Sequence, residues 1–514
     1  MRLRLALLVV TLLLVAPALT RGAMLAAQDA SPYVPLGHWA MPYVEHLITV
    51  GVMRDPAPLT RPLTRAGLLR ALRAVDTARV SPAVSGTLRR LLAAFDAAPP
   101  APRYRLAGDI GVGAATYTRR DALAAVDANG PRSAGPKHAT ASGGVDLELL
   151  LGPVMAVTHP YFDTRLKYDP DWFGKKDRFV AGRTAESYVA AQWRFGELLF
   201  GRLDRNWGPS ALQGLLLSAN PYGLDHLAVA LGTPNLQIQA IATQLDDGAD
   251  SGVVAHRYME QHRVWVRPSN RWAVALWEGS VLSGRDRQFE PWYLNVMNLG
   301  FLEQLNTGTN VNTFVGLDIE RRGAFTLFGQ FMLDDIQVDR KTATDQKPSS
   351  YALTVGGKGG FGTGSLGWTL FYTRVTNLTY RNEDSLQVPL FHSLGTGRNF
   401  ADYDQVTLKL GLVPRPVLLL EPEVTLLRQG EGDPRLPHPP VAAYPTTATI
   451  FAGVVERTVR LALGAGWQGG AWGLSGNGGV HFIHNAGHVT GASQTKWIGA
   501  LTLAYRFHLE GVLP

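Results

Sequence analysis

The sequence contains no cysteine among its 514 residues. Disulfide bonds, thiolate metal sites and attachment of lipid to an N-terminal cysteine are therefore excluded. There is also no strong excess of charge of one sign. The formal net charge is +7, and three of the positive charges, Arg2, Arg4 and Arg21, lie near the N-terminus. The remaining chain is mildly basic. Acidic polymers are plausible partners for such a chain, and nothing in its charge pattern indicates nucleic acid.

Long apolar segments are missing as well, apart from one run near the N-terminus. Residues 5–19 are mostly apolar, follow two arginines and precede small residues at Ala23, Ala26 and Ala27. This pattern predicts a cleaved secretory signal peptide over residues 1–27, because the apolar run is too short and poorly flanked for a stable spanning helix. An exported chain with near-zero mean hydropathy and no helical span is either soluble or a β-barrel, since only helices and closed sheets satisfy their backbone in lipid.

Glycine and aromatic residues are abundant, with 55 Gly, 16 Tyr and 12 Trp, as suits tight turns and aromatic belts. The clearest pattern covers residues 497–509, where large apolar residues occupy every second position and the last positions between them are polar. A period of two predicts a strand with one apolar face. We expect Tyr505 and Phe507 to point outward in a lipid-facing girdle, and Arg506 to point into a lumen.

The chain divides near residue 100. Before it, apolar residues recur at helical spacing and an Ala/Pro-rich linker follows; after it, the period switches to two. Short turns then alternate with long loops, an asymmetry typical of outer-membrane barrels with tight periplasmic turns and extended outer loops. The sequence predicts an all-β transmembrane barrel of about 18 antiparallel strands with a small N-terminal helical periplasmic domain. The predicted boundaries are 1–27 for the signal peptide, 28–100 for the helical periplasmic region and 101–514 for the barrel.

The predicted connections can be placed along the chain. Short turns are expected near residues 151–153, 194–197, 267–270, 320–323, 413–416 and 468–470. Long loops are expected at residues 119–143, 169–184, 284–309, 339–350, 377–401 and 429–446.

Several local motifs of the predicted barrel resemble one known family. They are Phe-Gly-Glu-Leu-Leu-Phe-Gly-Arg at 195–202, Trp-Gly-Pro at 207–209, Leu-Ser-Ala-Asn-Pro at 217–221, Pro-Trp-Tyr-Leu-Asn at 291–295 and Leu-Asp-Asp at 333–335. Together they resemble the Wzi family of capsule-assembly outer-membrane proteins over roughly residues 104–510. The resemblance implies an outer-membrane β-barrel that helps surface polysaccharide associate with the cell and is not an enzyme. Ser210 departs from the family, which often has Gly there.

The same region supplies candidate contacts to a polysaccharide. Arg and Asn can donate to sugar hydroxyl or uronate groups, and Trp or Tyr offers a flat face to a pyranose ring. The candidates are Arg202, Arg205, Asn206, Trp207, Trp172, Arg285, Trp292 and Tyr293. The alternative interpretation is that Arg202 and Arg205 pair with luminal acids and that Trp207 belongs to the aromatic girdle.

A second resemblance covers the helical part. The segments 33–40, 44–47, 51–53 and 62–66 are similar to a single S-layer-homology module. This implies binding to peptidoglycan or another wall polymer, with Trp39, Thr64 and Arg65 as candidate contacts. Gly67 stands where the module has Glu, and the alternative is a helical hairpin that packs Trp39 under its own helices beneath the barrel.

Other patterns do not indicate a catalytic or metal site. Residues 362–367 match G-x-G-x-x-G but lead into a strand instead of a helix, which argues against a dinucleotide. His481 and His484 are three residues apart and would face opposite sides of a strand. The Asp doublets at 246–247 and 334–335 end strands and are expected to be solvated loop ends. We therefore expect no enzyme, no metal and no cofactor.

Two functions stay open from the sequence. One is an outer-membrane barrel that binds or attaches surface polysaccharide during capsule or exopolysaccharide assembly. The other is a porin-like channel tethered to the cell wall through its N-terminal module. Expected partners are surface polysaccharide, outer-membrane lipid and a wall polymer, but not nucleic acid.

Overall fold

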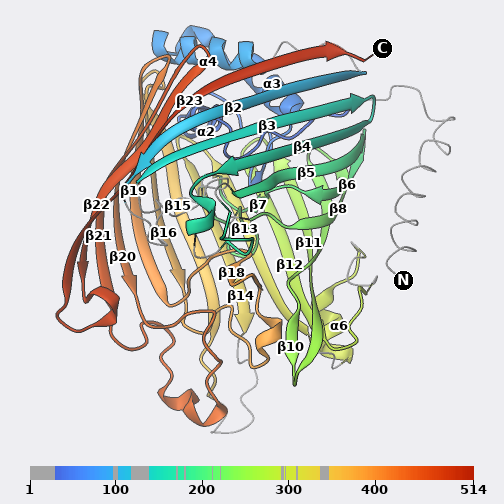
Figure 1. Cartoon of the computed structure of the whole chain (residues 1–514), viewed down its shortest axis with the longest axis vertical. Coiled ribbons are helices and arrows are strands. Elements are labelled where there is room, and N and C mark those ends of the chain that lie inside the picture. The colour runs from blue at the N-terminus through green and yellow to red at the C-terminus, as the bar shows by residue number, and fades with distance from the viewer. Residues whose placement is uncertain are drawn as a thin grey trace, which may run out of the picture.

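The fold is a closed antiparallel β-barrel with a helical region at one end (Figure 1). Within the residues that the structure describes, eighteen strands form the barrel and β23 pairs with β2 across the seam, which confirms the predicted fold class. The computed structural model describes residues 29–95, 102–116, 138–169, 172–178, 181–210, 212–219, 222–290, 295, 297–307, 311–335 and 346–513.

The barrel strands follow one another around the wall in chain order. They are β2 (Arg103–Ala115), β3 (Ala139–Leu151), β4 (Val154–Asp163), β5 (Ala181–Trp193), β6 (Gly196–Arg202), β8 (Asp225–Thr233), β9 (Leu236–Gln244), β11 (Val253–Ser269), β12 (Trp272–Gly284), β13 (Val311–Arg322), β14 (Thr326–Asp335), β15 (Ser350–Phe361), β16 (Leu366–Val375), β19 (Tyr403–Arg415), β20 (Leu418–Gln429), β21 (Glu456–Gly469), β22 (Trp472–His484) and β23 (Ser493–Val512). The short strand β10 (Gly248–Asp250) pairs with the start of β11.

Short and long connections alternate around the barrel, as predicted. Each predicted turn lies at or within a few residues of an observed one, and two further short turns, at 234–235 and 362–365, were not predicted. The predicted loop at 119–143 falls largely outside the described residues, and its last five residues belong to β3. We call the end with the short turns the turn end and the opposite end the loop end.

The last strand shows the predicted alternation. Tyr505 and Phe507 are 43% and 40% exposed, and the ring of Tyr505 packs edge-on against Trp472 of the neighbouring strand. Arg506 points the other way and donates to Gln468 Oε1. The apolar face is therefore on the outside of the barrel, where lipid replaces water.

The N-terminal residues form a helical region, called the N-domain, that covers the turn end (Figure 1). Its elements are α2 (Met41–Thr49), β1 (Thr60–Arg61), α3 (Arg65–Arg73), the 3-10 turn η2 (Thr77–Arg79) and α4 (Pro82–Phe95). Their apolar faces form one core, which Val413 and Leu419 of the barrel join. Tyr43 donates to the carbonyl oxygens of Val417 and Gly466, each at 2.9 Å, which fixes the helices to the barrel rim.

Among the helices in the described part of the chain, none has both the length and the apolar character that crossing a membrane requires.

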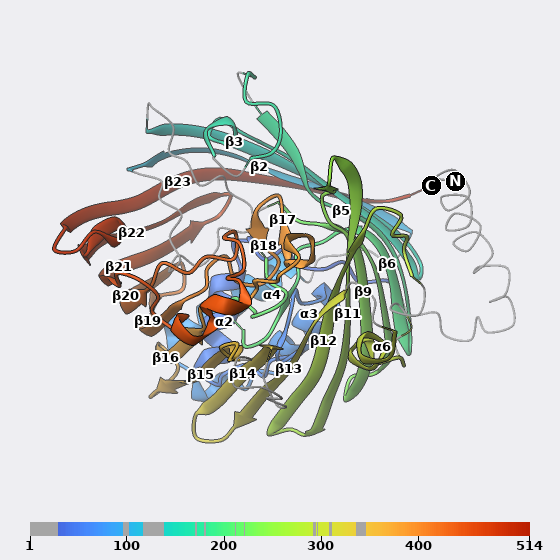
Figure 2. The same ribbon diagram turned by 90° about the horizontal axis from the view of Figure 1, so that it is seen from below.

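Three chain segments enter the lumen and pack together as an internal plug. They are residues 55–61 of the N-domain, the β6–β8 loop and the β16–β19 loop, whose strands β17 (Leu390–Phe391) and β18 (Leu394–Gly395) form a small hairpin. Viewed from the loop end, this hairpin lies inside the ring of strands, and the N-terminal helices at the turn end are visible behind it (Figure 2). The N-domain strand β1 pairs with β7 (Asn206–Trp207) of the β6–β8 loop. The β6–β8 and β16–β19 loops share one core with the barrel wall. Residues 55–61 join them through the β1–β7 pairing.

The plug fills the lumen beside β11 and β13 but not beside β22. On β11 and β13, lumen-facing residues such as Arg263 and Asp318 are sealed from solvent. On β22, Ser475 and Asn477 alternate with the lipid-facing Leu474 and are exposed. Solvent therefore reaches the lumen beside the plug along this part of the wall.

Candidate functional site

One buried arginine of the wall holds the N-domain segment inside the barrel. Arg263 on β11 donates to Thr60 Oγ1 at 2.7 Å and to the Leu59 carbonyl oxygen at 2.8 Å. Its guanidinium also pairs with Asp318 at 3.0 Å, and both side chains are 0% exposed. A buried guanidinium group is stable only where its partners are fixed, so Arg263 locks the position of the segment.

The β6–β8 loop is held by the same wall. Gln330 on β14 donates to the Trp207 carbonyl oxygen at 3.0 Å and accepts from the Leu215 amide at 2.9 Å. The Asn206 side chain is used within the loop, donating to the Leu212 carbonyl oxygen and accepting from the Gly214 amide. Local side-chain bonds of this type fix the irregular backbone that follows β7.

The predicted contacts Asn206 and Trp207 lie deep in the plug. Trp207 is 2% exposed, and its ring lies 5.2 Å from the Arg263 guanidinium carbon. Asn206 is 7% exposed. Neither side chain has a face open to a sugar ring in this arrangement.

The two neighbouring arginines are paired. Arg202 binds Asp225 at 2.7 Å at the loop end of β6. Arg205 donates to His226 Nε2 at 3.0 Å, lies 3.9 Å from Glu197 and stacks over the ring of Tyr33 at 5.7 Å. Arg205 thus joins the wall to the start of the N-domain, as the alternative interpretation of these arginines describes.

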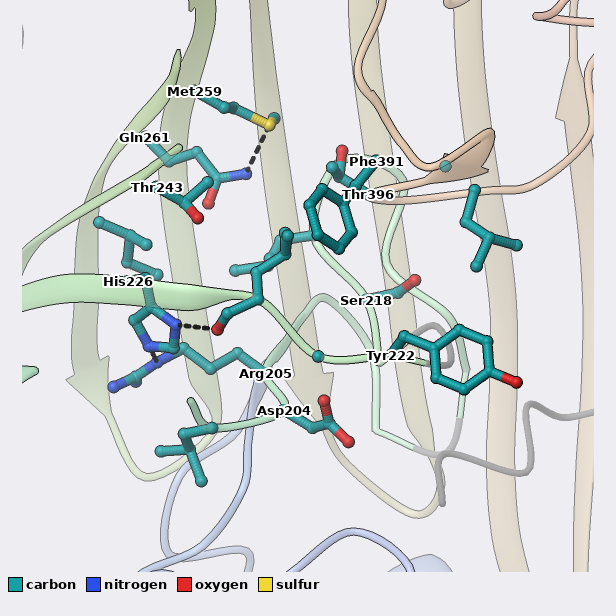
Figure 3. Close-up of a pocket in the computed structure, with 17 residues that line it drawn as sticks. Asp204, Arg205, Ser218, Tyr222, His226, Thr243, Met259, Gln261, Phe391 and Thr396 are labelled. Carbon is teal, nitrogen blue, oxygen red and sulfur yellow. Dashed lines mark hydrogen bonds between the residues drawn. The ribbon is translucent and has the colours of Figure 1, made fainter. Parts of the chain in front are cut away.

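A small cavity lies beside Arg205, between the β6–β8 loop, the wall and the β17–β18 hairpin (Figure 3). Phe391 and Thr396 line it from the hairpin, and His226 lines it from the wall. Its volume of about 50 Å³ accommodates one or a few water molecules but not a pyranose ring.

Asp204 lines the same cavity and is 5% exposed. Burial raises the pKa of this carboxyl group to about 6, although the nearby guanidinium groups of Arg183 and Arg202 act in the opposite direction. Asp204 therefore titrates at a mildly acidic pH.

The loop-end aromatic residues form a second cluster. Trp172 in the β4–β5 loop is 9% exposed and packs with Leu166, Tyr222 and Leu394. The next residue, Phe173, is 49% exposed. The exposed aromatic side chain of this loop is therefore Phe173, one residue after the tryptophan that was predicted. Trp172 itself packs in the buried cluster and anchors the loop.

The other candidates are dispersed. Arg285 is largely exposed and pairs with Asp250 at 2.8 Å. Trp292 and Tyr293 lie outside the described residues. The predicted polysaccharide contacts thus do not form a single site: some build the plug, and Trp172 and Arg285 lie in separate loops.

The predicted wall-binding residues lie in the N-domain. Thr64 caps α3 by accepting from the Gly67 amide at 3.2 Å. Arg65 donates to both carboxylate oxygens of Glu148 on β3, at 2.6 and 2.9 Å. Trp39 is half-buried and packs edge-on against Tyr43. Binding of a wall polymer by these residues stays a prediction, and a polymer at Arg65 would compete with Glu148.

The sequence did not reveal which residues position the plug hairpin. Arg257 on β11 donates to the carbonyl oxygens of Leu386, Val388 and Leu390 at 2.7, 2.6 and 3.2 Å. The sequence feature that could have indicated these contacts is the pair of Asp doublets at 246–247 and 334–335. Asp246 accepts from the His392 amide at 3.0 Å and Asp334 from the Tyr380 amide at 2.7 Å, so they hold the β16–β19 loop and are not merely solvated strand ends.

No cluster of three or more His, Asp or Glu side chains in the described residues is placed to hold a metal ion.

The closed barrel, its lipid-facing aromatic residues and its turn and loop asymmetry are those of outer-membrane proteins. Among solved structures, the chain is similar to Wzi of Escherichia coli, described as an outer membrane protein involved in group 1 capsule assembly and a carbohydrate-binding β-barrel. The TM-score is 0.60 at 13% identity, covering 95% of this chain and 100% of Wzi. This likeness shows a shared fold.

Two Pseudomonas aeruginosa outer membrane proteins match less well. OprD has a TM-score of 0.45 at 10% identity, covering 80% of this chain and 96% of OprD. OpdK has a TM-score of 0.44 at 12% identity, covering 80% of this chain and 99% of OpdK. No protein-family model and no curated protein matches the chain.

Proposed function

We propose that this protein binds surface polysaccharide at the outer face of the outer membrane, takes part in capsule or exopolysaccharide assembly, and is not an enzyme. The observation that carries the proposal is the packed plug. A barrel built for solute passage keeps its lumen open. In this chain, two loops share a core with the wall inside the lumen, and residues 55–61 pair with one of them there. The carbohydrate binding stated for Wzi supports the same function.

In this proposal the loop end faces outward and the N-domain lies in the periplasm. The N-domain helices rest on the turns of β19–β20 and β21–β22 and cover the turn end beneath the exposed part of the lumen. A polymer bound at the loop end is held by many weak contacts along its length, so the site needs no deep pocket.

Deletion of the protein tests the proposal. We expect polysaccharide synthesis to continue, while polymer shifts from the cell-bound to the released fraction. Equal cell-bound polysaccharide in the deletion strain and its parent would contradict the assembly role.

A porin-like channel is the second candidate, favoured by the solvent-exposed Ser475 and Asn477 on the lumen side of β22. Single-channel recording in a planar bilayer distinguishes the two functions. A large, steady current through the full chain supports the channel, and its absence supports the plugged binding protein.

A further inference from the structure

The β4–β5 loop presents aromatic and basic side chains together at the loop end. Among its described residues, Leu166, Asp169 and Trp172 are buried, and Asp169 accepts from the Tyr222 hydroxyl at 2.5 Å. Phe173, the residue after this anchor, is about half exposed, and Lys175, Lys176 and Arg178 are exposed just beyond it. The buried residues fix the backbone, so the exposed ones project from a defined position.

A ring from a different loop stacks on Phe173. The His392 imidazole lies 4.2 Å from the Phe173 ring, with an angle of 19° between their planes. Phe391 and Tyr222 meet Phe173 edge-on, with centroids at 6.0 and 5.6 Å. Edge-on neighbours fix the orientation of an aromatic ring, so the Phe173–His392 pair is held in place although its side chains are partly open to solvent.

The backbone that carries His392 is strained. His392 and Ser393 connect β17 and β18 and have positive φ values of 47° and 65°. Two consecutive positive φ values in a two-residue hairpin define a type I′ turn, which favours Asn-Gly. Residues with a Cβ are strained in this conformation. Strain of this kind persists where surrounding contacts hold it. Here the His392 amide donates to the Asp246 carboxylate, and Arg435 donates to the Ser393 carbonyl oxygen.

We propose that the Phe173–His392 pair is a platform for one sugar ring of an anionic polysaccharide, whose carboxylate is bound by Lys175, Lys176 or Arg178. Apolar C–H faces of a pyranose pack on an aromatic surface, and ammonium and guanidinium groups nearby select a uronate over a neutral sugar. This inference rests on the proposed function and adds to it the class of sugar and the residues that bind it.

Calorimetric titration of the full-length protein in detergent tests the platform, with oligoglucuronate and a neutral glucan of equal length as probes. We expect Phe173→Ala to weaken oligoglucuronate binding about tenfold or more. The double variant His392→Asn with Ser393→Gly retains the turn and loses the stacked ring, so it should weaken binding without lowering the Tm. Replacing Lys175, Lys176 and Arg178 together by Gln should remove the preference for the anionic probe.

Phe325→Ala is the matched control, because Phe325 is 48% exposed but lies in a short turn at the opposite end of the barrel. Oligoglucuronate binding that is unchanged by Phe173→Ala and by the turn variant would overturn the platform and leave the proposed function standing. Binding only to vesicles that contain lipopolysaccharide, and not to free oligosaccharide, would assign this surface to the membrane and also overturn the inference. Absence of all saccharide binding, together with unchanged cell-bound polymer in the deletion strain, would remove the proposed function itself.

Discussion

At the residue scale, Arg263 is the clearest point at which one side chain controls the plug. Its guanidinium bonds Asp318 on the wall and Thr60 and Leu59 of the N-domain, all away from solvent. We expect Arg263→Met to destabilise the protein by about 3–5 kcal/mol, because Asp318 is left buried without its counter-charge. Limited proteolysis should then release the N-domain at a lower temperature than in the parent protein.

Two further variants make this result specific. Arg79→Ala changes an arginine side chain that is 89% exposed and should leave proteolysis unchanged. Adding Asp318→Asn to Arg263→Met removes the unpaired charge and should recover part of the loss. If the Arg263→Met protein is as resistant to proteolysis as the parent, Arg263 does not hold the N-domain segment in place.

Asp204 provides a pH-dependent effect at the same scale. Burial raises the pKa of its carboxyl group to about 6, above the value near 3.8 that an exposed Asp has. Between these values the folded state binds more protons than the unfolded state, so this group makes stability fall as pH rises through that range. We expect Asp204→Asn to flatten the decrease in Tm between pH 4 and pH 6.5 and to be the more stable protein above pH 7.

The control for this prediction is Asp177→Asn, at a side chain that is 73% exposed. Its Tm profile should parallel that of the parent. A parallel profile for Asp204→Asn would show that the Asp204 carboxyl group does not titrate in this range.

Sequence reasoning at this scale named residue types correctly but could not assign their surroundings. Trp207 and Trp172 are aromatic residues in loops, as a sugar platform requires, yet both are buried against residues of other segments. The partners that decide this lie far away in the sequence: Gln330 for the Trp207 backbone and Leu394 for Trp172. Local pattern carries no information on such contacts.

At the scale of elements, α3 connects the N-domain to the barrel through the Arg65–Glu148 pair. If Arg65 also binds a wall polymer, Arg65→Ala should weaken sedimentation with purified cell wall, whereas Glu148→Gln releases the guanidinium and should maintain or increase it. Arg70→Ala, at an exposed residue of the same helix, is the control. Sedimentation unaffected by Arg65→Ala would leave this arginine with the anchoring role alone.

The strands were predictable because their signal is local. In β23 the polarity of each side chain matches the face of the strand on which it lies. Tyr505, Arg506 and Phe507 could therefore be oriented from alternation alone. The internal path of the β16–β19 loop could not be predicted. It depends on contacts such as the bond from the Tyr380 hydroxyl to the Leu215 carbonyl oxygen, between residues of two different loops.

At the scale of the whole molecule, plug and N-domain together determine whether ions pass. We expect the full chain to give no steady current in a planar bilayer, and a chain lacking residues 29–95 to conduct, because both the cover of the turn end and residues 55–61 are then removed. Both proteins should migrate differently on gels when boiled and unboiled and give strand-dominated circular dichroism, which verifies that each barrel is folded. A large current through the full chain would contradict a closed lumen.

The pairing of Thr60 with Trp207 also has a consequence for the order of events during biogenesis. The strand that receives β1 is made nearly 150 residues later in the chain, and the seam between β2 and β23 joins the two ends of the barrel sequence. Contacts of such large sequence separation form slowly. Residues 55–61 therefore reach their final place in the lumen only after β7 and the strands around it have formed, although they are synthesised earlier.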